Sequence, residues 1–166
     1  MEITGQHQSE QPGKEYLMSP QPMVIRGNYK GSDKLKHKVA LITGGDSGIG
    51  RAIAVHFARE GADVAIVYKE EEQKDAEETA RMVESEGGKC ALIKSDLREP
   101  DNCSKIVKQT IDEFGKINVL VNNAAEQFPK ESLKEISYEQ LLDTFKTNIF
   151  PHFLVTQAAL QHMQER

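Results

Sequence analysis

Residues 39–50 read VALITGGDSGIG, and this stretch decides the fold of the chain. Its first four residues form a short apolar run, which is typical of a strand buried on both faces of a parallel sheet. A cluster of glycines follows, and beyond it apolar residues recur at helical spacing until Gly61, a good helix stop. A glycine-rich turn directly after a strand and directly before a helix predicts a binding site for the pyrophosphate of a dinucleotide.

Three glycines of this turn have separate physical roles. Gly44 lets the chain leave the strand in a tight turn, Gly48 lets the backbone approach a pyrophosphate, and Gly50 lets the helix pack closely on the sheet. The start of the helix offers free N–H groups and the positive end of its dipole to the phosphates. The alternative interpretation is a glycine-rich turn that only connects two elements.

Strands and helices alternate along the rest of the chain. The predicted strands cover residues 39–42, 64–67, 90–93 and 119–121, and the predicted helices run from 49 to Gly61, from about 72 to 86, from Pro100 to Gly115 and from Ser137 to Leu154. This alternation predicts an α/β fold of the Rossmann type, in which a doubly wound parallel sheet lies between two layers of helices. Pro151 should bend the last helix because it has no N–H group for the carbonyl of Thr147. Asn148 lies at this weak point, where its side chain and a water could satisfy the freed backbone groups.

Composition excludes several classes of protein. The chain has 166 residues, enough for one domain with a core, and its net charge of −5 is a poor match for nucleic acid, which needs a basic face. No apolar run approaches the roughly 18 residues of a membrane span, and no signal peptide is visible, so we expect a cytoplasmic protein that binds neither membrane nor nucleic acid. Cys90 and Cys103 match no metal or redox motif, and the five histidines form no metal-type pair. We therefore expect reduced thiols and no metal site.

Residues 1–36 differ in composition from the rest and form an N-terminal arm, while residues 37–166 form the predicted Rossmann domain. The arm is rich in Gln, Pro, Gly and Ser, and its prolines break any helix. It is either flexible or lies on the domain or on a neighbouring subunit. Apolar side chains that such an arm could bury are Tyr16, Leu17, Met18, Met23, Val24 and Ile25.

Four motifs, in order along the chain, resemble those of the short-chain dehydrogenases/reductases. Thr43 followed by the spacing Gly-x-x-x-Gly-x-Gly is similar to the glycine motif of that family, and Asp96-Leu97 after the third strand is similar to its adenine-contacting Asp. Residues 122–125, Asn-Asn-Ala-Ala, resemble its Asn-Asn-Ala-Gly motif, and Asn148 matches its Asn in the helix after the fourth strand. The arm, together with residues 28–32, also resembles a bacterial branch of the family, some of whose members are labelled general stress proteins.

The resemblance implies an NAD(P)-dependent oxidoreductase that transfers hydride between nicotinamide and a small carbonyl or alcohol substrate. It assigns to the cofactor Thr43, Gly44, Asp46, Ser47, Gly48, Ile49, Gly50, Tyr68, Lys69, Asp96, Leu97, Asn123, Ala124 and Ala125. It assigns a catalytic role to Asn148, which would hold a water that feeds protons to a Lys. Asn123 is expected to tie the fourth strand to its neighbour, and Asp96 could alternatively be a simple cap.

The family's Tyr-x-x-x-Lys is not found, since no tyrosine is followed by a lysine four residues later, and the strand that would carry the family's catalytic Ser is expected after Arg166. We therefore expect the cofactor half of a longer enzyme, inactive by itself, with the sheet interrupted after the helix that follows the fourth strand. That strand would be an open edge, and Phe150, Phe153 and Leu154 would be exposed, so the isolated chain should be marginally stable or self-associated. Competing hypotheses are a dinucleotide-binding sensor without turnover and a flavodoxin-like domain that binds FMN.

The choice between NAD and NADP depends on the end of the second strand. NAD-specific relatives usually place an acidic residue there to bind the ribose 2′-hydroxyl. This chain has Tyr68 and Lys69, and the lysine could pair with a 2′-phosphate, although Glu70 is adjacent. The sequence thus favours NADP slightly. The run 70–72, three glutamates, is expected to be a solvated helix start, and a homo-oligomer, a dimer or a tetramer, is expected from the resemblance.

Overall fold

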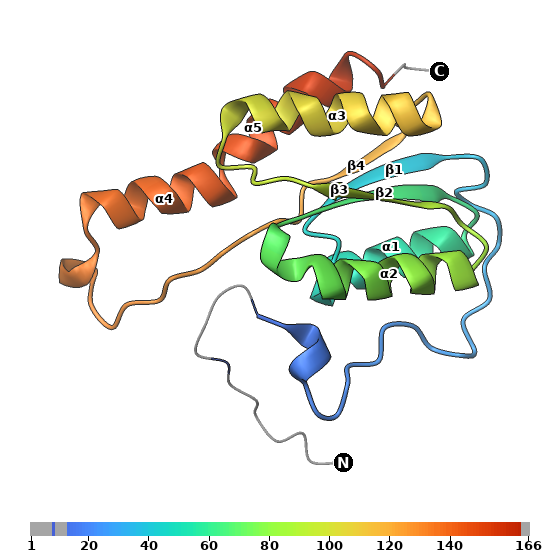
Figure 1. Ribbon diagram of the computed structural model, residues 1–166, viewed down its shortest axis with the longest axis horizontal. Helices are drawn as coiled ribbons and strands as arrows, with labels where there is room; N and C mark the ends of the chain where they lie inside the picture. The colour runs from blue at the N-terminus through green and yellow to red at the C-terminus, as the bar shows by residue number, and fades with distance from the viewer. Residues whose placement is uncertain (1–7, 9–12, 164–166) are drawn as a thin grey trace.

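A four-stranded parallel sheet forms the middle of the protein in the computed structural model, which describes residue 8 and residues 13–163. The strand order is β3-β2-β1-β4. In Figure 1 the helices α1 and α2 cover one face of the sheet, and α3 and α5 cover the other. The Rossmann-type, three-layer α/β fold predicted from the sequence is therefore confirmed.

The strands are β1 (Val39–Thr43), β2 (Asp63–Tyr68), β3 (Cys90–Lys94) and β4 (Val119–Val121). The helices are α1 (Gly48–Arg59), α2 (Gln73–Ser85), α3 (Pro100–Phe114), α4 (Tyr138–Asn148) and α5 (Phe150–Leu160), with short 3-10 turns η1 (Glu15–Leu17), η2 (Glu70–Glu72) and η3 (Leu133–Glu135). In the parallel register of the sheet, Leu41 of β1 lies opposite Ala65 of β2 on one side and opposite Leu120 of β4 on the other. The predicted strands and the first three predicted helices are present, with ends that shift by one or two residues, whereas the last predicted helix is two helices and continues to Leu160.

Alternate residues of the central strands point into two separate cores. Ile42 and Ile66 pack with α1 and α2, while Leu41 packs with α3 and α5. All three side chains are fully buried, which explains why the strands read as continuous apolar runs rather than as alternating ones. The two cores fix the carboxyl ends of β1 and β2 side by side.

The last helical stretch is broken as the position of Pro151 predicts. Helix α4 ends at Asn148 and α5 begins at Phe150, and the residue between them, Ile149, has φ −121° and ψ −58°. Pro151 lies in the first turn of α5, where its missing N–H costs nothing. The Asn148 side chain hydrogen-bonds to the backbone of Glu126, and its expected role at the break, together with a water, stays a prediction.

Strand β4 pairs with β1 alone and forms one edge of the sheet within the described residues. Helix α5 nevertheless has a packing partner in α3, and Val155 is fully buried between them and the sheet. Phe150 and Phe153 are exposed as predicted, but Leu154 is half-buried in the second core, so that part of the expectation is wrong. Self-association of the chain stays a prediction.

The arm, from Gly13 onward, follows the outer side of α1 and α2 in Figure 1. Val24 and Ile25 pack against the first core, whereas Leu17 and Met23 are exposed. Further along the arm, the backbone N–H of Ser32 donates to the carboxylate of Glu60 at the end of α1 (2.9 Å). Both polar contacts and partly buried apolar side chains thus hold the arm on this chain's own helices.

We expect Gly50→Ala to destabilise the protein strongly. Helix propensity alone predicts a gain of about 1 kcal/mol for alanine inside a helix. A Cβ at position 50, however, would lie 1.9 Å from the carbonyl oxygen of Gly44, which is backbone and cannot move aside. The result should be a loss of about 3 kcal/mol in the free energy of unfolding, measured by chemical denaturation.

Gly13→Ala is the matched control, because a Cβ there meets nothing within 4 Å. A Gly50→Ala variant as stable as the parent would show that α1 does not pack on the end of β1 at this distance.

Candidate functional site

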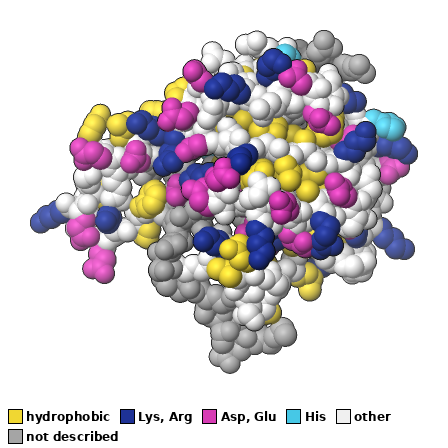
Figure 2. Space-filling view, viewed as in Figure 1, with side chains coloured by type: hydrophobic (Ala, Val, Ile, Leu, Met, Phe, Trp, Pro, Cys, Tyr) yellow, Lys and Arg dark blue, Asp and Glu magenta, His cyan; other side chains and the backbone are white. Residues whose placement is uncertain are grey.

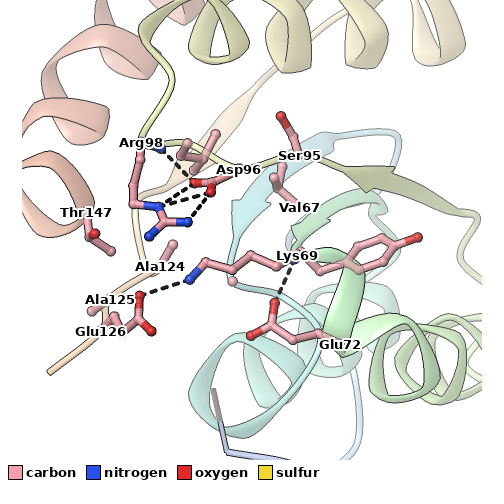
Figure 3. Close-up of a pocket in the computed structure, with 13 residues that line it drawn as sticks. Val67, Lys69, Glu72, Ser95, Asp96, Arg98, Ala124, Ala125, Glu126 and Thr147 are labelled. Atoms are coloured by element: carbon pink, nitrogen blue, oxygen red, sulfur yellow. Dashed lines mark hydrogen bonds and ion pairs between the residues drawn. The ribbon is translucent and has the colours of Figure 1, made fainter. Parts of the chain in front are cut away.

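A cleft opens at the carboxyl ends of the four strands, and its empty space of about 570 Å³ includes open solvent. Its lining residues, shown in part in Figure 3, are Gly44, Val67, Tyr68, Lys69, Glu72, Ser95, Asp96, Leu97, Arg98, Ala124, Ala125, Glu126 and Thr147. Strand order reverses at this point, since β1 continues to β2 on one side and pairs with β4 on the other. Open α/β sheets bind ligands at such a switch point, so the fold itself marks this cleft as the candidate site.

The glycine-rich turn joins β1 to α1 beside the cleft. Gly44 and Gly48 have φ of +62° and +52°, a region that side chains rarely adopt, so both positions need glycine. The N–H of Gly44 donates to Val67 O (2.8 Å), which fixes the turn against the end of β2. A Cβ on Gly48 would meet nothing within 4 Å, so the space in front of this residue is open.

Asn123 and Thr43 join the ends of β4 and β1. The side-chain amide of Asn123 donates to Thr43 O (3.0 Å) and to Gly44 O (2.7 Å). The hydroxyl of Thr43 accepts from the backbone N–H groups of Asn123 and Ala124. These bonds replace ladder hydrogen bonds where the two strands diverge, so both residues have a structural role at the base of the cleft.

Two ion pairs border the cleft in Figure 3. Lys69 at the end of β2 reaches Glu126 beyond β4, with 2.9 Å between Nζ and Oε2, and so spans the cleft. Asp96 beyond β3 pairs with Arg98 at 2.5 Å and also accepts the backbone N–H of Arg98. Hydrogen bonds from the Arg98 side chain hold the pKa of Asp96 below its usual value, so Asp96 is an anion at neutral pH.

Asn148 lies at the end of α4 and is linked to the cleft through Glu126. Its side-chain oxygen accepts the N–H of Glu126, and its side-chain nitrogen donates to Glu126 O, both at 2.8 Å. This paired contact fixes the segment that follows β4.

Glu72 differs from the solvated glutamate that was expected in the run 70–72. Its side chain is half-buried at the edge of the cleft and accepts the N–H of Lys69 (2.7 Å). Burial, and to a smaller degree the nearby Asp46, raises the pKa of Glu72 to about 7. The expectation holds for Glu70 and Glu71, which are exposed, and is wrong for Glu72.

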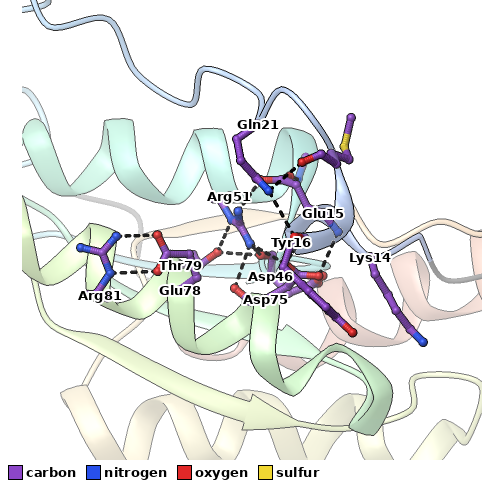
Figure 4. Close-up of polar contacts among 12 residues, drawn as sticks. Lys14, Glu15, Tyr16, Gln21, Asp46, Arg51, Asp75, Glu78, Thr79 and Arg81 are labelled. Carbon is purple, nitrogen blue, oxygen red and sulfur yellow. Dashed lines mark hydrogen bonds and ion pairs between the residues drawn. The ribbon is translucent and has the colours of Figure 1, made fainter. Parts of the chain in front are cut away.

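Behind the glycine-rich turn lies a cluster of buried charged groups, drawn in Figure 4. Arg51 in α1 is 2% exposed, and its guanidinium donates to the carbonyl oxygen of Asp46 and to the carboxylate of Asp75 in α2. Asp46 is itself 2% exposed, and burial raises the pKa of its carboxyl above the usual value. The turn is therefore held from behind by α2, on the side away from the cleft.

The structure brings together half of the residues that the sequence assigned to the cofactor. Those that line the cleft are Gly44, Tyr68, Lys69, Asp96, Leu97, Ala124 and Ala125. Those beside or behind it are Thr43, Asp46, Ser47, Gly48, Ile49, Gly50 and Asn123. Among the latter, Gly48 and Ile49 are exposed in the first turn of α1, whereas the Asp46 side chain is buried and does not face the cleft.

Sequence reasoning missed Arg98, Glu126 and Glu72, which also line the cleft. Arg98 and Glu126 each come directly after a recognised motif, so their positions after Asp96-Leu97 and after the run 122–125 could have indicated them. Glu72 could not be found in this way, because its burial depends on the packing of η2 against the turn.

Other kinds of site have little support in the part of the chain that the structure describes. No group of three or more His, Cys, Asp or Glu side chains there is arranged to hold a metal ion, and no helix there has the length and apolar character needed to cross a membrane. Acidic and basic side chains are interspersed on the face shown in Figure 2. Cys90 and Cys103 are free thiols, and burial raises the pKa of Cys90 to about 12.

Comparison with known proteins gives a consistent result. The family described as short chain dehydrogenase matches residues 38–166. General stress protein 39 of Bacillus subtilis (strain 168) is 55% identical over 163 residues, which are 98% of this chain and 57% of that protein. The chloroplastic NADPH-dependent aldehyde reductase 1 of Arabidopsis thaliana is 47% identical over 165 residues, which are 96% of this chain and 57% of that protein.

Among solved structures, a short chain dehydrogenase from Burkholderia cenocepacia J2315 in complex with NADP superposes with a TM-score of 0.74 and 34% identity, covering 79% of this chain and 53% of that one. The chain thus spans a little over half the length of the relatives it matches.

Glu72 should make the stability of the protein depend on pH. Below pH 4.5 the carboxyl is protonated in both the folded and the unfolded protein, and above pH 7 it is ionised in both, at a cost in the folded one. The free energy of unfolding should therefore fall by about 2 kcal/mol as the pH rises between these values. Glu72→Gln should remove this fall, as measured by urea denaturation across the range.

Glu113→Gln, on an exposed position of α3, is the control and should leave the fall unchanged. If the fall persists in Glu72→Gln, another group causes it and the Glu72 carboxyl is more solvated than the structure indicates.

Proposed function

Because the chain belongs to the short-chain dehydrogenase family, we propose that it forms the dinucleotide-binding part of an NAD(P)-dependent oxidoreductase acting on a small carbonyl or alcohol. The dinucleotide, when bound, supplies or accepts the hydride. The observation that carries the proposal is the start of α1, which lies beside the cleft at the switch point of the sheet with open space in front of Gly48.

The pyrophosphate binds at the first turn of α1. Helix N-termini bind phosphates because the first N–H groups have no partner within the helix and the dipole is positive there. The first hydrogen bond of this helix runs from Arg51 N–H to Ser47 O, so the N–H groups of Ile49 and Gly50 belong to that unpaired set. The left-handed conformation of Gly48 turns the backbone so that it can approach the phosphates.

The adenosine part occupies the cleft. Asp96 and Leu97 lie on one side of it, and Ala124 and Ala125 lie on the other, at a spacing set by the parallel pairing through β1 and β2. The small alanines leave room for a flat ring, and the Asp96 carboxylate can accept a hydrogen bond from an amino group.

Asn148 has the position that the family resemblance assigns to a proton relay. Its side chain is fixed by Glu126, which leaves one amide hydrogen and one lone pair for a water. The sequence contains no Tyr-x-x-x-Lys. We therefore place the acid–base groups of the reaction on a part of the protein outside these 166 residues, and we expect the 166-residue chain alone to bind cofactor without turnover.

The cofactor is NADP rather than NAD. Support comes from Lys69, whose ammonium reaches across the cleft where a 2′-phosphate would lie, and from Arg98 on the same border. The 2′-phosphate would replace Glu126 as the partner of the Lys69 ammonium, so one charge-assisted hydrogen bond would be exchanged for another. A relative described as NADPH-dependent and a similar structure in complex with NADP agree with this choice.

Several broader features are part of the same proposal. Residues 37–166 act as the Rossmann domain and residues 1–36 as its arm. The free thiols of Cys90 and Cys103 suit the cytoplasm, and the exposed Phe150 and Phe153 suit a contact with another part of the assembly in a dimer or tetramer. Small molecules, and not nucleic acid or membrane, are the expected partners.

Calorimetric titration with NADPH and NADH tests the function. The wild-type chain should bind both, with the higher affinity for NADPH. Lys69→Ala should weaken NADPH binding by about ten-fold and NADH binding by much less, since only NADPH carries the 2′-phosphate. Lys108→Ala, which removes an exposed lysine that is paired with Asp112 on α3, is the matched control.

A wild-type chain that is folded and binds neither dinucleotide would refute the function. An equal loss for NADPH and NADH in Lys69→Ala would refute only the preference for NADP.

A further inference from the structure

The arm reaches the glycine-rich turn at η1, where residue Glu15 enters the buried cluster behind the turn (Figure 4). Glu15 is 6% exposed, although glutamate is almost never buried without a partner. The residues that receive it, Arg51 and Asp75, are each 2% exposed. The charged side chain of Glu15, which belongs to a Gln- and Pro-rich arm, is thus buried beside the candidate cofactor site.

Asp75, in the first turn of α2, holds the backbone of the arm. Its two carboxylate oxygens accept the N–H groups of Glu15 and Tyr16, each at 3.0 Å. The ammonium of Lys74 lies over the ring of Tyr16, 4.0 Å from its centre. Both contacts hold η1 against α2 beside the turn.

The Glu15 carboxylate binds the turn itself. One oxygen accepts the backbone N–H of Gly48 at 2.6 Å, and the other pairs with the guanidinium of Arg51. Arg51 in turn donates from Nη2 to Asp46 O at 2.7 Å, and the hydroxyl of Thr79 donates to the same oxygen at 2.7 Å. The segment from Asp46 to Gly48 is therefore held at both ends by groups from the arm and from α2.

We propose that Glu15 is a positioning residue for dinucleotide binding, and that docking of the arm and binding of the cofactor strengthen each other. The proposal rests on the proposed function, because it concerns the same turn. Gly48 has a left-handed backbone, and a Cβ on it would meet nothing within 4 Å, so no side-chain packing at this position holds its conformation. The hydrogen bond from Gly48 to Glu15 supplies that constraint from behind.

The carboxylate stabilises the turn without taking the place of the phosphates. Glu15 is absent from the lining of the cleft and belongs to a separate hollow on the outer side of α1 and α2. Its charge is opposed by Arg51, so the like-charge repulsion toward a pyrophosphate is reduced. The Glu15 carboxylate accepts a hydrogen bond from the N–H of Gly48. The next two unpaired donors of the helix, the N–H groups of Ile49 and Gly50, stay available for the phosphates.

Preorganisation explains why the coupling is favourable. A turn that is already ordered does not lose conformational freedom when the dinucleotide binds, so the affinity rises. Coupling between two binding events is reciprocal, and a bound dinucleotide must therefore hold the arm more firmly by the same factor. A residue with a merely structural role would lower the melting temperature when changed but would show no such link.

The first experiment compares Glu15→Gln with Glu113→Gln in calorimetric titrations with NADPH, well below the melting temperature. Glutamine keeps the size of the side chain but has no charge and only one acceptor oxygen, so it cannot form the ion pair with Arg51 and accept the N–H of Gly48 from a second oxygen. Glu15→Gln should lower the affinity by about ten-fold, the usual size of an allosteric coupling. Glu113→Gln, an exposed change of the same chemistry on α3, should have no effect.

The second experiment uses the unmodified chain, so it does not depend on the folding of a variant. Amide hydrogen exchange at Glu15 and Tyr16, whose N–H groups bind Asp75, should slow by about ten-fold when NADPH saturates the protein. Exchange at Cys103 in α3, on the opposite face of the sheet, is the internal reference.

The outcomes separate this proposal from the function on which it rests. If the unmodified chain binds no dinucleotide, the proposed function fails. If it binds NADPH but Glu15→Gln binds equally well, or exchange in the arm is unchanged, Glu15 is only a structural residue and the proposal is overturned. If Glu15→Gln binds more tightly and NADPH speeds exchange in the arm, the carboxylate competes with the phosphates, which also overturns it.

Discussion

The close contact between the end of β1 and the first turn of α1 is the constraint on which the rest of the structure depends. A methyl group at position 50 would lie 1.9 Å from Gly44 O, so the helix can start here only because residue 50 is glycine. This contact aims the helix start at the carboxyl edge of the sheet. Unpaired N–H groups and a positive dipole end then lie beside a cleft whose other walls come from β2, β3 and β4.

The local signals of the sequence were sufficient for the architecture. Buried parallel strands give uninterrupted apolar runs, as at residues 39–42, and helices that end at a left-handed glycine, such as α3 at Gly115, give a clear stop. The break before Pro151 was also predictable, because a missing N–H and a crowded ring act at a known position. These features depend on neighbours within a few residues, which is why reading along the chain could find them.

The polar interior was not predictable in the same way. Arg51 and Glu15 are 36 residues apart, and the sequence shows only a helix position and a residue of a polar arm. Glu72 looked like part of a solvated acidic run, and its raised pKa results from burial that only the packed structure reveals. Buried ion pairs have no periodicity, because each one depends on where three or more elements meet.

Cleft, turn, buried cluster and arm form one connected set of contacts. The turn lies in the middle, with Asn123 holding it from β4, Val67 from β2 and Arg51 from behind. Burying charges costs free energy that their pairing only partly returns, so the cluster by itself is weak evidence for stability. Such an arrangement suits a site where a phosphate must be met by backbone groups that are already in place.

The central claim is that the turn between β1 and α1 receives the phosphates of a dinucleotide. Calorimetric titration with NADPH of two glycine variants tests it most directly. Gly48 and Gly115 both have a left-handed backbone and open space at the Cβ position, so Gly48→Ala and Gly115→Ala carry a similar strain. The account predicts that Gly48→Ala weakens binding by about ten-fold, equivalent to about 1.4 kcal/mol, and that Gly115→Ala, at the end of α3, leaves it unchanged. Equal affinities for both folded variants would contradict the account, because the added methyl group would then stand where no ligand approaches.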